Sequence, residues 1–172
     1  TRERLSVVQA LIEHRPVTVV TTMDALMNRV PPLSSYERGI FTIDLEETVD
    51  LNEMRKKLVM LGYENVTQVE HPGEFAVRGG IVDIFPLTEE HPIRMELWGD
   101  EIDSIRSFSA ESQRSLENLE TVKIYPAAEI IFEEAVLEKG LKKIEADAKK
   151  LSELYQKEMK TEEAHRVRML AS

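Results

Sequence analysis

The stretch from residue 66 to residue 108 consists of short apolar segments separated by turns that contain glycine or proline. Connections this short cannot hold a crossover helix, so neighbouring strands are predicted to run antiparallel. The segments are also rich in the β-branched and aromatic residues that strands favour. The predicted strands comprise residues 66–69, 74–77, 81–85, 93–98 and 102–108, and the turns include Pro72-Gly73, Gly79-Gly80 and Gly99-Asp100.

A helix is predicted just before these strands, over residues 51–61. Its apolar stripe consists of Leu51, Met54, Leu58 and Leu61. Asp50 is placed to cap the start of this helix, with Glu53 three residues later as in a capping box. Gly62 suits the left-handed conformation in which helices often end. One helix packed on a small antiparallel sheet gives an α+β domain, which we expect to span residues 40–121.

The amino-terminal segment has a different pattern. Residues 2–13 show apolar residues at helical spacing, and Thr22 can cap a short helix over residues 23–29. The β-branched run at residues 17–21 is predicted to be a buried strand. These pieces are too small to enclose a core, so residues 1–39 are expected to belong to a larger α/β domain.

The carboxy-terminal segment is predicted to return to the same flanking domain. A polar linker at residues 109–121 leads into a strand at residues 122–126, and a long amphipathic helix follows from about residue 133. We therefore expect residues 122–172 to form a third segment. Because Thr1 is not an initiator methionine and the helical pattern continues to the last residues, we expect the chain to be an excerpt of a longer protein.

Composition and charge restrict the classes of function. The 172 residues carry a formal net charge of −10 and include no cysteine, which excludes a disulfide scaffold and makes binding to a nucleic-acid backbone unfavourable. The chain has no phosphate-binding loop, and its histidines are scattered, at His14, His71, His91 and His165. We therefore predict no catalytic residue, metal site or cofactor. No apolar run reaches the roughly 18 residues that span a bilayer, which favours a cytoplasmic location.

The predicted strand at residues 93–98 carries the most informative pattern. Alternation places Ile93, Met95 and Leu97 on the core side, and Arg94, Glu96 and Trp98 on the open side. The same alternation at residues 74–77 buries Phe75 and Val77 and exposes Ala76 and Arg78. Arginine and tryptophan are enriched among interface hot spots, so Arg78, Arg94 and Trp98 are predicted to form one docking patch. A solvated face, a homodimer contact or an internal contact would give the same pattern, and the residues alone leave these alternatives open.

Two long motifs resemble the bacterial transcription-repair-coupling factors. The motifs are PGEFAVRGGIVDIFPL at residues 72–87 and PIRMELWGDEIDSIR at residues 92–106, and SQRSL at residues 112–116 also fits. The excinuclease subunit UvrB shares part of this pattern and is the alternative. UvrB is expected to have a second arginine where this chain has Ala76, and a D-P-x-T-G-like turn where it has Ser112 to Ser115.

The resemblance implies a docking function. In that family a small α+β domain, inserted in a degenerate helicase-like domain, binds the repair protein UvrA. The family's UvrA contacts match Arg78, Arg94 and Trp98, although the family usually has phenylalanine at the last position. Glu96 is expected to orient Arg94. The resemblance further implies a parent protein that is an ATP-driven DNA translocase acting on stalled RNA polymerase, with ATP and Mg²⁺ bound outside these residues.

Overall fold

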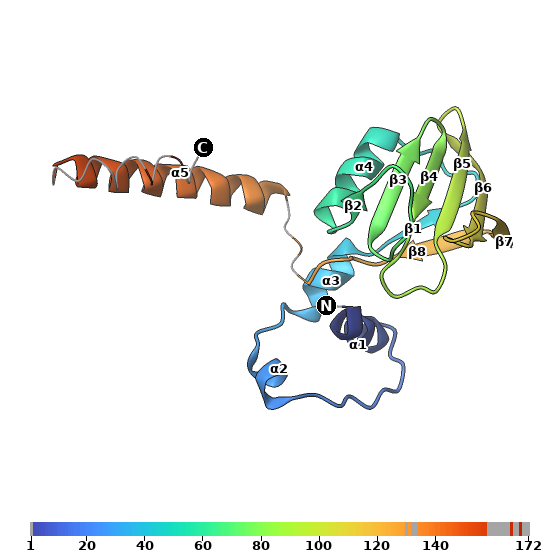
Figure 1. The fold of residues 1–172 in the computed structure, drawn as a ribbon, viewed down its shortest axis with the longest axis horizontal. Helices are drawn as coiled ribbons and strands as arrows, with labels where there is room; N and C mark the ends of the chain where they lie inside the picture. The colour runs from blue at the N-terminus through green and yellow to red at the C-terminus, as the bar shows by residue number, and fades with distance from the viewer. Residues whose placement is uncertain (1, 130, 132–133, 158–165, 167–168, 170–172) are drawn as a thin grey trace. The chain divides into compact units, whose positions relative to one another are not determined.

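The computed structural model of this chain describes residues 2–129, 131, 134–157, 166 and 169. These residues belong to two compact units, Thr1–Ile131 and Phe132–Ser172. The first unit contains helices and two β-sheets, as the α+β prediction requires, and the second contains one long helix (Figure 1).

The larger sheet of the first unit is formed by short strands that follow one another along the chain. Its strands, in spatial order, are β2 (Glu64–Asn65), β3 (Glu74–Arg78), β4 (Ile81–Ile84), β5 (Ile93–Trp98), β6 (Glu101–Phe108) and β7 (Ser115–Leu119). All neighbours from β3 to β7 pair antiparallel, whereas β2 and β3 are parallel. Two hairpin turns use glycine at positive φ, Gly79 at 61° and Gly99 at 64°. The predicted turns therefore set the antiparallel order.

Helix α4 (Leu51–Met60) covers one face of this sheet, beside β3 in Figure 1. Met54 and Leu58 are buried in the same core as the apolar residues of the central strands. The predicted cap is confirmed, because Asp50 Oδ1 accepts hydrogen bonds from the backbone N–H groups of Asn52 and Glu53, at 2.8 and 3.2 Å. The helix thus begins at the residue that the sequence indicates.

A second, two-stranded sheet joins the start and the end of the α+β region. Strand β1 (Phe41–Asp44) pairs antiparallel with β8 (Thr121–Ile124), with Phe41 opposite Ile124. Ile43 and Ile124 are buried in the core that α4 shares with the larger sheet. Strand β8 therefore packs with the region 40–121, although all of it except Thr121 lies beyond the predicted end of that region. The predicted division into domains stays a prediction.

Two strand predictions are wrong. Residues 17–21 form no strand, and Val20 is 95% exposed, because no neighbouring strand among the described residues pairs with them. Residues 66–69 are also not a strand. Val66 still donates its backbone N–H to the carbonyl oxygen of Phe75 at 2.9 Å, and Val69 is fully buried against Ala76 and Phe85.

Besides the short strand β2, two elements were not predicted. Strand β7 lies within the expected polar linker, and its residues are mostly exposed, so the apolar alternation that marks a half-buried strand is missing. Helix α3 (Leu33–Gly39) follows Pro32 and has only seven residues, too few for a clear helical period. Both elements depend on contacts distant in sequence: β7 pairs with β6, and Tyr36 of α3 is buried against α1.

The amino-terminal helices agree with the sequence. Helix α1 (Arg2–Ile12) buries Leu5 and Val8. Helix α2 (Met23–Met27) is capped by Thr22, whose Oγ1 accepts a hydrogen bond from the backbone N–H of Ala25 at 3.2 Å. Figure 1 shows α2 in a long loop between α1 and α3, and none of its residues is buried.

The second unit contains helix α5 (Glu134–Lys157), as predicted. Its apolar residues Leu141 and Ile144 are 51% and 58% exposed. The predicted continuation of the helix to the end of the chain falls mainly on residues outside the described ones. Among the residues that are described, no helix is both long and apolar enough to cross a membrane.

A hydrogen bond between Glu13 and Tyr125 joins the segment after α1 to the segment after β8. The Tyr125 hydroxyl donates to Glu13 Oε1 at 2.5 Å, and Gln9 and Arg15 also donate to this carboxylate. These hydrogen bonds, that of Tyr125 foremost, hold the pKa of Glu13 below its ordinary value. Because the pKa is lowered in the folded state, the stabilisation is present above the unfolded pKa and is lost as pH falls.

Tyr125→Phe should therefore lower the free energy of unfolding by about 1 kcal/mol at pH 7, and by less at an acidic pH that lies below the lowered pKa of Glu13. Urea unfolding at both pH values measures this difference. Tyr63→Phe is the matched control, because the Tyr63 hydroxyl donates to an uncharged acceptor, the carbonyl oxygen of Tyr125, at 2.7 Å. The loss of unfolding free energy in Tyr63→Phe should be the same at both pH values. Equal pH dependence of the two variants would contradict a charge-dependent bond.

Candidate functional site

The strand register fixes which side chains share the sheet face opposite α4, here called the outer face. One row across β3 to β6 consists of Ala76, Asp83, Arg94 and Arg106, and the next consists of Arg78, Ile81, Glu96 and Ser104. The intervening residues Phe75, Val82 and Met95 are buried on the α4 side. The predicted alternation of residues 93–98 is thus confirmed, and the outer face is rich in charge.

Asp83 is the centre of this face. The residue is 0% exposed, and its carboxylate accepts three hydrogen bonds. Arg94 donates through Nε to Oδ1 at 2.7 Å and through Nη2 to Oδ2 at 2.8 Å, while Arg78 donates through Nη2 to Oδ2 at 2.6 Å. A buried carboxylate is tolerated when such charged donors surround it. The two arginines therefore share one buried counterion.

Arg94 is more enclosed than the sequence predicted. Its side chain is only 17% exposed, because the loop after β6 folds back over it. Gln113 Oε1 accepts a hydrogen bond from Arg94 Nη2 at 3.0 Å, and the guanidinium lies 4.3 Å from the ring centre of Phe108. The hydrogen bonds to Asp83 raise the pKa of Arg94 above its ordinary value, so it stays charged.

Arg78 and Trp98 lie open, as predicted. The Arg78 side chain is 43% exposed although one of its nitrogens is held by Asp83. Trp98 is 85% exposed at the end of β5, just before the turn at Gly99. A tryptophan with this exposure offers a large apolar surface to a partner. The outer face therefore presents one guanidinium and one indole to solvent.

One expectation about this face is wrong, and the orienting role of Glu96 stays a prediction. Glu96 forms its ion pair with Arg106 of the neighbouring strand, while Arg94 is hydrogen-bonded to Asp83. Ala76, expected to be open, is 1% exposed because the segment around Val69 covers that end of the sheet.

Sequence reasoning missed Asp83 and Arg106 as members of the site. Asp83 is the one charged residue in the otherwise apolar strand Ile81–Ile84, and a charge in such a strand needs a partner, which is the signal that could have identified it. With these residues included, the outer face has the arginines Arg78, Arg94 and Arg106, and the same alternation adds the carboxylates of Glu74 on β3 and of Glu101, opposite Trp98, to those of Asp83 and Glu96. Of the three arginines, Arg78 has the most exposed side chain, at 43%.

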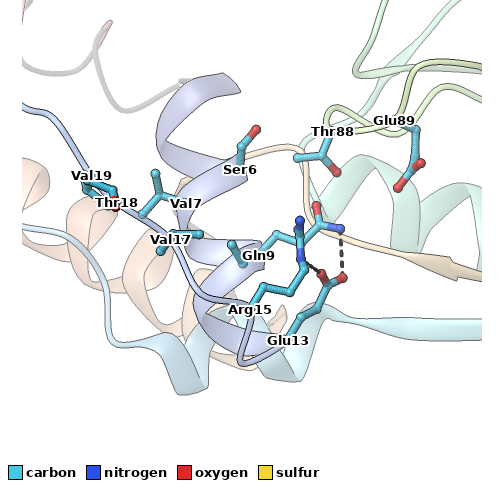
Figure 2. Close-up of a pocket in the computed structure, with 11 residues that line it drawn as sticks. Ser6, Val7, Gln9, Glu13, Arg15, Val17, Thr18, Val19, Thr88 and Glu89 are labelled. Atoms are coloured by element: carbon cyan, nitrogen blue, oxygen red, sulfur yellow. Dashed lines mark hydrogen bonds and ion pairs between the residues drawn. The ribbon is translucent and has the colours of Figure 1, made fainter.

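A pocket of about 600 Å³ lies elsewhere in the first unit, beside α1 (Figure 2). Ionisable residues in its lining are Glu13, Arg15 and Glu89, and Figure 2 shows Gln9 and Arg15 directed at the Glu13 carboxylate. The lining includes no histidine, cysteine or lysine, and Glu13 already accepts three hydrogen bonds. Within the described residues, no group of three histidine or acidic side chains could hold a metal ion.

Arg94→Ala should lower the free energy of unfolding by about 2 to 3 kcal/mol, because it leaves the buried Asp83 carboxylate with Arg78 as its one charged donor. Arg55→Ala is the control, since Arg55 is an exposed arginine on α4. Urea unfolding of both variants measures the difference. If the two losses are equally small, the Arg94–Asp83 pair contributes no more than a surface ion pair, within about 1 kcal/mol.

Comparison with known proteins gives the family of this chain. The family model described as the UvrB interaction domain matches residues 41–130. The transcription-repair-coupling factor of Bacillus subtilis (strain 168) is 37% identical over 161 residues, which cover 91% of this chain and 14% of that protein. The factor of Staphylococcus aureus (strain MRSA252) is 39% identical over 135 residues, which cover 78% of this chain and 12% of that protein. The resemblance found in the motifs is confirmed, and this chain, which spans about a seventh of the length of the first of these relatives, belongs to the UvrB interaction domain family.

Proposed function

We propose that this chain is a docking module that binds UvrA and so recruits it in transcription-coupled nucleotide excision repair. The observation that carries the proposal is the outer face, where Arg78 and Trp98 are exposed together on a rigid sheet. The family match over residues 41–130 and the similarity to transcription-repair-coupling factors support UvrA as the partner.

The chemistry of the outer face favours protein binding over catalysis. An exposed indole contributes apolar contact area, and a guanidinium supplies directional donors to a carboxylate. Both side chains project from β-strands whose opposite face is packed against α4, so a partner meets a surface that is already formed. Such preorganisation lowers the entropy lost on binding.

The parent protein is proposed to supply the remaining activities. Residues 1–39 and 122–172 would belong to a degenerate helicase-like domain, where the exposed run at residues 17–21 would find its paired strand. ATP hydrolysis with Mg²⁺, DNA translocation and contact with RNA polymerase would lie in other parts of the parent. The chain itself would act by recruitment rather than by catalysis, with the cytoplasm as its location.

Arg78→Ala should weaken UvrA binding by about 1 to 3 kcal/mol, because it removes an exposed cation from the contact surface. Isothermal titration calorimetry with purified UvrA measures the loss, and circular dichroism checks that the variant stays folded. Arg55→Ala, which alters α4 on the other side of the sheet, should bind UvrA like the unsubstituted chain. Binding should also weaken as salt rises, since salt screens the exposed charge. A folded Arg78→Ala variant with unchanged affinity would contradict the assigned role.

Trp98 is the single tryptophan of the chain, so its fluorescence reports on the outer face alone. The free chain should emit at long wavelength, and a UvrA fragment without tryptophan should shift the emission to shorter wavelength. Trp98→Phe should bind UvrA nearly as well as the unsubstituted chain, because it keeps an aromatic side chain at this position. Trp98→Ala should lose about 2 kcal/mol of binding free energy. An emission spectrum that UvrA leaves unchanged would place Trp98 outside the contact.

A further inference from the structure

Asp83 has a place in the outer face that no partner can reach. The residue is fully buried, whereas both arginines that bind it extend to the surface, with 43% of the Arg78 side chain exposed and 17% of the Arg94 side chain. A group with no exposed area makes no direct contact with a docked protein. Any effect of Asp83 on docking must therefore act through the side chains that it holds.

We propose that Asp83 is a positioning residue for docking, which fixes the Arg78 guanidinium so that it receives a carboxylate of the partner. The proposal rests on the proposed function, because it assigns a role within the UvrA-binding face. Asp83 Oδ2 accepts from both Arg78 and Arg94, so a single oxygen atom ties a side chain of β3 to one of β5. The more enclosed Arg94 thereby holds the Asp83 carboxylate, and Asp83 in turn holds Arg78.

The geometry also indicates which N–H groups of Arg78 bind Asp83 and which remain for a partner. Arginine has five N–H groups, and the bond to Asp83 uses Nη2 at one side of the guanidinium. The exposed remainder of the side chain carries N–H groups that a partner acceptor can reach. The positive charge of this exposed guanidinium favours an acidic acceptor. A carboxylate is the group whose two oxygens match the planar donors of a guanidinium.

Restraint of Arg78 before binding has a physical consequence for affinity. A free arginine side chain loses rotamer entropy when a partner immobilises it, and that loss opposes association. In this chain the Arg78–Asp83 bond of 2.6 Å restricts the side chain in advance. Asp83 would then raise affinity without touching the partner.

A double-mutant cycle separates positioning from a general effect on stability. UvrA is titrated into four proteins: the unsubstituted 172-residue chain, Asp83→Asn, Arg78→Ala and the double variant. Asp83→Asn should weaken binding about tenfold or more in the parent background. In the Arg78→Ala background the same change should cost less than about threefold, because the side chain through which Asp83 acts is gone. Equal losses in the two backgrounds would overturn the proposal.

Asp44→Asn is the matched control for the change from carboxylate to amide. Asp44 is an exposed residue of β1, outside the larger sheet, so this variant should bind UvrA like the parent. Thermal unfolding of every variant shows whether binding follows stability. If UvrA affinity falls only in proportion to the unfolded fraction, Asp83 acts on folding and the positioning role is wrong.

A second measurement needs no variant of Asp83 and tests the geometry even if Asp83→Asn fails to fold. In ¹⁵N NMR spectra of the free parent chain, the Arg78 guanidinium should show hindered rotation, whereas exposed Arg55 should rotate freely. Free rotation of Arg78 would overturn the inference. If the unsubstituted chain fails to bind UvrA while rotation of the Arg78 guanidinium is hindered, the proposed function is wrong and the restraint of Arg78 by Asp83 stands.

Discussion

The outer face depends on one buried charge, the carboxylate of Asp83. A carboxylate without solvent exposure requires charged donors, and Arg78 and Arg94 supply three hydrogen bonds from the strands on either side of it. Because both arginines donate to the same group, displacement of either one leaves the buried carboxylate with fewer charged donors. The exposed guanidinium of Arg78 is thus held by a residue that is itself buried.

The scaffold beneath this face makes the restraint effective. On the other side of the sheet, α4 closes an apolar core in which Leu58, Phe75 and Met95 are fully buried. The β1–β8 pair joins the same core and brings the two ends of the α+β region together. Closely paired ends suit a domain inserted in a larger protein, since such a domain leaves the path of the surrounding chain unchanged.

Structural and docking roles are distributed unequally among neighbouring residues of the outer face. Arg94 lies between Asp83, Gln113 and the ring of Phe108, so most of its side chain is occupied by contacts within the domain. Arg78 and Trp98 stand at turns, where the exposed side chains meet solvent. Hydrogen bonding inside the sheet therefore determines which of the two arginines can present most of its donors to a partner.

The sequence by itself determined the α+β class, the turns, the cap at Asp50 and the side of β5 on which Arg94 and Trp98 lie, because these follow from local propensity and from the two-residue period of a strand. It did not determine that residues 17–21 lack a partner strand, that β7 pairs through its backbone, or that Val69 covers Ala76. Nor did it assign the counterion of Arg94 to Asp83 instead of Glu96. Those features were decided by tertiary structure, because strand pairing and ion pairing join residues whose separation in sequence carries no periodic signal.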